Sequence, residues 1–220
     1  MNILIAPDTT LFWTALATNG LFLAAALRYA PWHAVLRVAV RQHALLGATL
    51  ALGVFWHLQV AVGEVIAIHP LAITTLTIVF GWSLAVVAGT LACGIFQLLG
   101  DGLWYAWPVD SLLSVILPAS ATWLVLLIIE RITWKNLFTY MLGAGFAGAM
   151  LSVLACGAGA LALFWLTGAQ PLLAVTREHF YLYGLLMFPE GFINGAMVSV
   201  ITVFWPQMVK TYDDDTYLGR

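Results

Sequence analysis

Long, uninterrupted apolar stretches dominate the chain and limit the folds that it can adopt. Hydrophobic residues make up 63% of its 220 positions, and only 8% are Asp, Glu, Lys or Arg. About a quarter of the residues in a soluble domain are charged, so most of this surface is expected to face lipid. A membrane span must satisfy its backbone internally, as a helix or a closed barrel. Because the apolar runs are continuous rather than alternating, the sequence predicts an all-α, polytopic helical membrane protein.

Breaks between the apolar runs predict about seven transmembrane helices in a single transmembrane domain, residues 1–220. We expect the spans at residues 10–28, 44–62, 70–81, 82–99, 111–129, 138–166 and 180–205. The stretch 70–99 is long for one span and short for two, at about 20 residues each. Phe80-Gly81-Trp82-Ser83 is therefore expected to hold a turn between two short, tilted helices. No basic residue precedes Arg28, so the first helix is expected to be retained rather than cleaved as a signal peptide.

The distribution of basic residues predicts an orientation. With seven spans, all Lys and Arg residues except Arg177 fall on the side that also holds the carboxyl terminus. Cytoplasmic loops carry the excess of Lys and Arg. We therefore expect the amino terminus outside, the carboxyl terminus in the cytoplasm, and a location in the inner (cytoplasmic) membrane of a bacterium. The acidic tail, residues 209–220, is most simply a solvated end, with a docking segment as the alternative.

Histidine and carboxylate side chains gather near the predicted outer face. His57, Glu64 and His69 lie at the outer end of the second span and in the loop that follows. An outer mouth that carries imidazoles and negative charge suits the capture of a divalent cation. His57 and His69 are the expected metal ligands, because both border apolar helices on the same side, and Glu64 is a supporting residue.

Three further carboxylates have different expected roles. Asp101 lies in a tight Gly-Asp-Gly turn, and Asp110 is expected to be solvated in the same outer loop. Glu190 lies within an apolar run, and an ionisable group inside a span suggests a functional role. The alternative is that Pro189 and Glu190 form the first turn of a helix. Asp101 and Glu190 are therefore expected to orient or complete a metal site.

Several function classes lack their sequence signatures. No Walker A, GxSxG or HExxH pattern occurs, so the chain is not expected to hydrolyse ATP or to be an enzyme. No basic patch suits nucleic acid. Cys93 and Cys156 lie in apolar stretches without CxxC spacing and are expected to be buried small hydrophobes.

The run from His69 to Pro118 resembles the CbiM/NikM-type substrate-capture components of energy-coupling-factor cobalt and nickel importers. The shared features are a His that opens a helix, a Gly-Trp break about a dozen residues on, the run Gln97-Leu98-Leu99-Gly100-Asp101-Gly102, and a Leu-rich helix. Pro7-Asp8 with Leu11-Phe12-Trp13, and Pro189-Glu190-Gly191-Phe192 with Trp205-Pro206-Gln207, are similar to the two ends of that family.

The resemblance implies a metal site and a mechanism. His69 matches the histidine in the family's outer loop, and Asp101 matches a turn that shapes the pocket. The family opens Met-His and holds metal with the terminal amine, the second amide and that imidazole, whereas residue two here is Asn2. His57 is the expected replacement. The resemblance further implies a coupling membrane subunit and cytoplasmic ATPases as partners, in addition to the lipid bilayer.

The expected substrate is a transported divalent transition metal, with Ni, Co, Zn and Cu left open, and no tightly bound cofactor is expected. Two alternatives remain at this point. The first is a membrane protein that holds haem or metal for redox or assembly work and transports nothing, which facing histidines on different helices would favour. The second is an assembly factor without a transported substrate.

Overall fold

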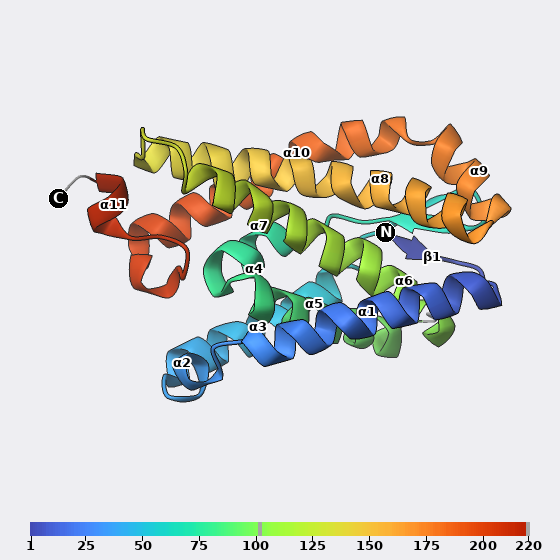
Figure 1. Ribbon diagram of the computed structural model, residues 1–220, viewed down its shortest axis with the longest axis horizontal. Coiled ribbons are helices and arrows are strands. Elements are labelled where there is room, and N and C mark those ends of the chain that lie inside the picture. Colours follow the sequence, from blue (N-terminus) through green and yellow to red (C-terminus); the bar gives the residue numbers. More distant parts are fainter. Residues whose placement is uncertain (101–102, 219–220) are drawn as a thin grey trace.

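The computed structural model describes residues 1–100 and 103–218. Long helices lie side by side along one axis, and the amino terminus lies within the bundle (Figure 1). The described residues contain five helical segments long and apolar enough to cross a membrane: Thr9–Tyr29 (α1), Trp82–Leu99 (α5), Trp104–Ile129, Thr139–Thr167 and Tyr181–Phe204 (α10). The prediction of a helical membrane protein is therefore confirmed in its main architecture.

Two of the long segments contain π-helical turns. Trp104–Ile129 runs through η1 (Trp104–Ala106), α6 (Trp107–Ser111), the π-helix η2 (Leu112–Ile116) and α7 (Leu117–Ile129), and Thr139–Thr167 joins the π-helix η3 (Thr139–Ala147) to α8 (Gly148–Thr167). The shorter helices are α2 (Trp32–Leu36), α3 (Ala39–Phe55), α4 (Ile73–Phe80), α9 (Gln170–Glu178), η4 (Pro206–Met208) and α11 (Asp214–Leu218).

Helix α4 occupies the centre of the bundle. All eight of its residues are buried, and it packs against α5, α7, α8 and α10. A helix that is apolar on all sides must be surrounded by other elements. Its threonines find internal partners: the Thr74 hydroxyl bonds to Thr122 at 2.9 Å, and the Thr75 hydroxyl donates to Asn194 Oδ1 at 2.7 Å.

A glycine separates α4 from α5 at the predicted turn. Gly81 has φ +83°, a conformation that glycine adopts without a Cβ clash. Helix α5 begins at Trp82 and ends at Leu99, the bounds expected for this span. The preceding segment is only eight residues long, too short to cross a bilayer, which needs about 20 residues.

A small sheet departs from the all-α prediction. Strands β1 (Asn2–Ile3), β2 (Val60–Val62) and β3 (Ile66–Ile68) form an antiparallel sheet in the order β1-β3-β2. The span expected over 44–62 therefore ends earlier, with α3 at Phe55. The physical reason is the β-branched run on both sides of the turn at Gly63 and Glu64, which favours a hairpin over a helix.

The segment after α10 folds back onto the bundle. The Lys210 N–H donates to the Val79 carbonyl at 2.9 Å, and Tyr212 and Tyr217 lie buried against Tyr140. The aspartates Asp213 and Asp215 remain exposed. Residues 209–218 are therefore seated by aromatic packing rather than free along their whole length.

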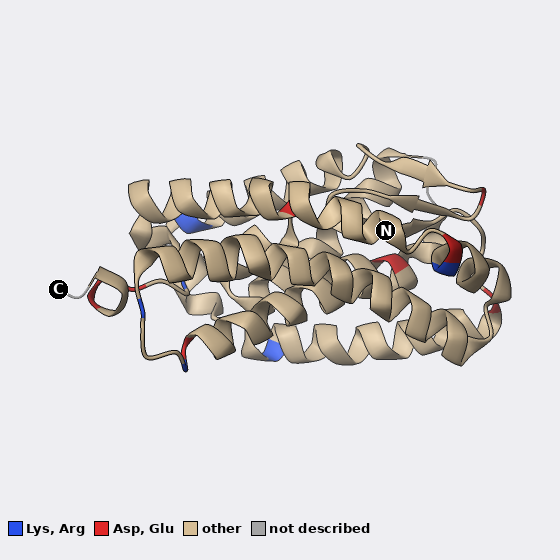
Figure 2. Cartoon of the chain, turned by 90° about the horizontal axis from the view of Figure 1, so that it is seen from above, with Lys and Arg blue, Asp and Glu red and all other residues tan. Residues whose placement is uncertain are grey.

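Basic residues gather toward one end of the molecule. Figure 2 shows most Lys and Arg in the half that holds the carboxyl terminus. At the opposite end, α9 packs against β3 and carries Arg177 in its last turn. The three-stranded sheet, which includes the amino-terminal strand β1, thus lies at the end with few basic residues.

Candidate metal site

The amine of Met1 is buried in the bundle and bonded to His69. Met1 and His69 are each 1% exposed. The Met1 nitrogen lies 2.8 Å from His69 Nε2 and 2.6 Å from Ser114 Oγ. Ser114 Oγ in turn donates to the Met1 carbonyl at 2.8 Å. Two nitrogen donors, one from the amino terminus and one from an imidazole, therefore face each other away from solvent.

The sheet and one helix bring these groups together. Strand β1 pairs Asn2 with Ala67 on β3, so Met1 lies beside the residues that follow β3. On the other side, the Ile3 N–H donates to Asp110 Oδ1 at 2.8 Å. Asp110 and Ser114 are one helical turn apart, so both point to the same side of their helix. The chain start is thus held between β3 and the α6–η2 segment.

The His69 ring is oriented by its backbone neighbour and by an aromatic ring. Its Nδ1 lies 2.9 Å from the Pro70 carbonyl, and a carbonyl only accepts, so Nδ1 carries the proton. In a neutral ring, Nε2 then presents its lone pair to the Met1 amine. The indole of Trp56 packs against the ring at a centroid distance of 5.0 Å. A histidine whose other nitrogen donates to a carbonyl is the usual arrangement of a metal ligand.

Burial favours the neutral forms of both nitrogens. It lowers the pKa of the Met1 amine, and it lowers the pKa of His69 well below its ordinary value, with the adjacent amine charge acting in the same direction and the Pro70 carbonyl opposing it. Removal from water disfavours the protonated, charged form of an amine or an imidazole. A metal ion needs a lone pair on each nitrogen, so this environment prepares both groups for coordination.

Glu190 holds the backbone just after His69. Its carboxylate accepts from the N–H of Leu71 at 2.9 Å and from the N–H of Ala72, and the amide of Asn194, one helical turn further on, also donates to it at 2.9 Å. Ala72 has φ +53°, the only positive φ of a non-glycine residue in the described part of the chain. Such a conformation costs of the order of 1–3 kcal/mol and persists where surrounding contacts fix it.

The space around the amine is small. Met1, His69, Cys156 and Tyr183 are among the residues that line it, and it has no room for a water molecule. The Tyr183 hydroxyl donates to the Met1 sulfur at 2.9 Å. Cys156 and Cys93 are both buried, in agreement with their expected character as small hydrophobic side chains.

The structure does not bring His57 to His69. His57 is exposed, its Nδ1 lies 3.2 Å from the carbonyls of Gly53 and Val54, and its ring packs on Phe96 at 4.7 Å. No two imidazole rings are in contact in the described residues. Nor do three or more His, Cys, Asp or Glu side chains meet there as a potential metal cluster.

The carboxylates have varied positions. Glu64 is exposed in the turn between β2 and β3. Asp101 lies outside the described residues. Asp110 was expected to be solvated, and this prediction was wrong: it is fully buried, because Ile3 and Gln97 donate to its two oxygens. Pro189 lies inside α10 rather than at a helix start, so the alternative explanation of Glu190 does not hold.

Ser114 and the Met1 amine complete the arrangement. Ser114 was not singled out from the sequence, although its spacing of four residues from Asp110 in an apolar run was a readable signal. The amine entered only through the family resemblance, because a residue pattern gives no sign that a chain terminus is buried.

Comparison with known proteins agrees with the resemblance. The family model described as the cobalt uptake substrate-specific transmembrane region, CbiM, matches residues 1–208, nearly the whole chain. The comparisons with curated proteins and with solved structures give no match. The chain therefore belongs to the CbiM family of cobalt uptake transmembrane regions.

Proposed function

We propose that this chain is the substrate-binding membrane component of an energy-coupling-factor importer, and that it captures a divalent transition metal ion with the Met1 amine and His69. The observation that carries the proposal is the 2.8 Å separation of the amine nitrogen and His69 Nε2 in a buried site. Two ligands about 2.0–2.1 Å from one ion and 90° apart are themselves about 2.9 Å apart. The pair is therefore spaced for adjacent positions around a single ion.

The remaining ligands differ from the nitrogen-rich set implied by the resemblance. The side chain of Asn2 donates to Gln59 Oε1 at 2.8 Å and is occupied away from His69. Ser114 Oγ lies 3.5 Å from His69 Nε2 and 2.6 Å from the amine, so it is the nearest oxygen donor. A set of nitrogen and oxygen ligands is compatible with Co, Ni, Zn or Cu(II).

We infer that the metal arrives from the outer face, at the end that holds the sheet. In this topology the amino terminus is outside, and the basic end with residues 209–220 is cytoplasmic. Seven passes would be made by the five long segments, by α3, and by α4 together with the non-helical residues 69–72 that precede it, because the eight residues of α4 alone are too short. The coupling membrane subunit and the ATPases would dock at the basic end, in a bacterial inner membrane. The packed amine site would have to expand before it binds an ion, because it has no room for a water molecule.

Metal content after purification in detergent tests this proposal. Wild type, His69→Ala and His57→Ala are incubated with Co²⁺, Ni²⁺, Zn²⁺ or Cu²⁺, desalted and measured by mass spectrometry. We expect one ion per wild-type chain, loss of at least tenfold in affinity in His69→Ala, and retention in His57→Ala. Retention in His69→Ala, or no metal in wild type, would overturn the proposal.

A further inference from the structure

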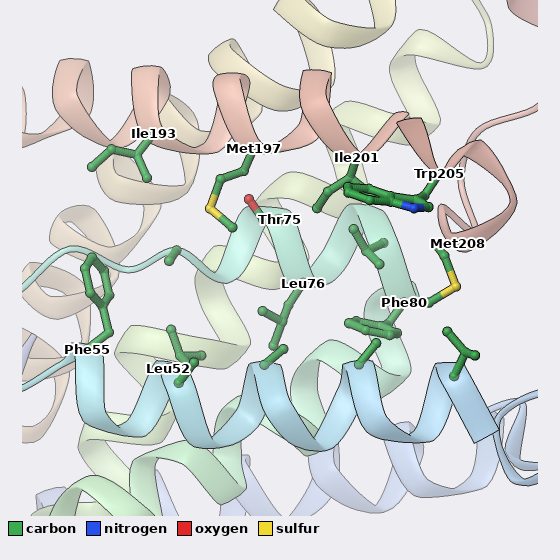
Figure 3. Close-up of a pocket in the computed structure, with 16 residues that line it drawn as sticks. Leu52, Phe55, Thr75, Leu76, Phe80, Ile193, Met197, Ile201, Trp205 and Met208 are labelled. Atoms are coloured by element: carbon green, nitrogen blue, oxygen red, sulfur yellow. The ribbon is translucent and has the colours of Figure 1, made fainter. Parts of the chain in front are cut away.

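An apolar groove runs along the side of the bundle between α3 and α10, with α4 as its floor (Figure 3). Its volume is about 580 Å³. Residues of α3 from Val40 to Phe55 form one wall, and Ile193, Met197 and Ile201 of α10 form the other. Among the described residues that line the groove, Thr75 is the only one with a polar side-chain oxygen, and that hydroxyl is already bonded to Asn194. An apolar molecule in the groove would therefore not bury an unpaired hydroxyl group.

A basic hollow continues the groove at one end. Val40 and Met208 line both spaces, and His33, Arg37 and Arg41 belong to the hollow. The groove is apolar and the hollow is cationic. Together they have the character of a binding site for an amphiphile with an anionic head.

The two arginines are open to a ligand. Arg41 donates to the Gln207 carbonyl at 3.0 Å through one nitrogen, and a guanidinium has five N–H donors. Within residues 1–100 and 103–218, neither Arg37 nor Arg41 has a carboxylate partner. Two neighbouring cations without compensating charge favour an anion, and phosphate matches the forked geometry of arginine.

We propose that one anionic phospholipid binds here, with its phosphate on Arg37 and Arg41 and one acyl chain in the groove. The α3 wall rises about 22 Å over its fifteen residue steps, enough for a chain that reaches through one leaflet of a core about 30 Å thick. The groove volume of about 580 Å³ lies within the range of pockets that bind one small ligand, about 300–1,000 Å³. Basic pockets between transmembrane helices are known to hold anionic lipid head groups.

The basic hollow favours a lipid over a partner helix as the occupant. An apolar helix could cover the groove, but it would leave the guanidinium groups of Arg37 and Arg41 without an anion. An anionic phospholipid fits both the apolar groove and the cationic hollow, so lipid is the occupant that the charges favour.

Native mass spectrometry of the full chain in a neutral detergent tests this proposal with two lipids of equal tails, dioleoyl phosphatidylglycerol and dioleoyl phosphatidylcholine. We expect a one-to-one adduct with a clear preference for phosphatidylglycerol. Each basic residue near a lipid surface contributes about fivefold in affinity, so Arg37→Ala/Arg41→Ala should lower phosphatidylglycerol binding by on the order of 30-fold. Arg131→Ala/Lys135→Ala, at the same end of the molecule, should leave it unchanged.

A second pair of variants tests the groove. Ala48→Trp fills it and should weaken both lipids, whereas Leu46→Trp, on an α3 position that is 61% exposed and outside the groove, should not. Equal retention of the two lipids, an unaffected arginine variant, or equal competition by tail-free glycerophosphoglycerol would overturn the proposal. So would an Ala48→Trp variant that keeps its lipid and loses a copurifying membrane subunit, because the groove would then be a protein interface.

Discussion

The backbone N–H of Ile3 donates a hydrogen bond of 2.8 Å to Oδ1 of Asp110, 107 residues further along the chain. The other carboxylate oxygen accepts from Gln97 at 3.0 Å. This buried carboxylate fixes the position of the first strand within the bundle. The location of the Met1 amine therefore depends on a residue that does not contact it.

Removal of the Asp110 carboxylate should release the amino terminus. Asp110→Ala leaves the Ile3 N–H and the Gln97 amide without an acceptor, and each buried donor left without a partner costs about 1–3 kcal/mol. We expect a lower thermal midpoint in detergent and faster modification of the Met1 amine by an amine-reactive reagent. Asp110→Asn keeps one acceptor oxygen and should lie between the two. Equal amine reactivity in all three proteins would refute the anchoring role.

Loss of the Glu190 carboxylate should weaken the metal site through the loop after His69. In Glu190→Leu the N–H groups of Leu71 and Ala72 lose their acceptor, and Ala72 loses the contact that holds its φ of +53°. We expect the free energy of unfolding to fall by about 2–4 kcal/mol, which lowers the thermal midpoint. We also expect weaker metal binding. Glu190→Gln retains an acceptor and serves as the matched control. Metal affinity that is identical in the Glu190→Leu and wild-type proteins would argue against this link.

The packing of Tyr183 gives a third prediction. A Cβ at Gly157 would lie 2.7 Å from Tyr183 Cγ, and the Tyr183 hydroxyl donates to the Met1 sulfur. Gly157→Ala should therefore destabilise the protein by about 1–3 kcal/mol through overpacking and should displace Met1. Gly184→Ala, where a Cβ meets nothing within 4 Å, should be neutral or slightly stabilising. Thermal midpoints measured side by side check this, and equal effects at the two glycines would contradict it.

Much of the helical framework was readable from the sequence. The span at 82–99 and the break before it were predicted correctly, because a long apolar run and Gly81 carry the information locally. The hairpin at 60–68 was missed, because the β-branched residues lie at the end of an apolar run that also suits a helix. The count of spans and their orientation remain predictions.

The candidate site was only partly readable. His69 and Glu190 stood out as ionisable groups beside or within apolar runs. The roles of Asp110 and Ser114 depend on the contact of residues 1–3 with a helix more than a hundred positions away, which no local pattern reveals. His57 was predicted as a ligand because it borders an apolar helix near His69, but in the structure its ring packs on Phe96 and does not contact His69.

The lowered pKa values of Met1 and His69 predict a pH dependence. Below an ordinary histidine pKa of about 6.5, the unfolded chain binds a proton that the folded His69 does not, so folding stability falls as the pH falls toward the folded pKa. The amine acts in the same direction from about pH 8 downward. We expect acidification from pH 7.5 to 5.5 to lower the thermal midpoint less in His69→Gln than in wild type. A larger decrease in the variant would show that the sign is wrong.

The most direct test of the metal-capture mechanism displaces the amine and keeps every side chain. One alanine is inserted before Met1, with processing of the new amino terminus checked by intact mass, and Co²⁺ and Ni²⁺ binding is measured in detergent beside the chain that begins at Met1. We expect the extended protein to remain folded and to lose metal affinity by at least tenfold, because its amine no longer lies 2.8 Å from His69 Nε2. Unchanged affinity in the extended protein would contradict coordination by the amine.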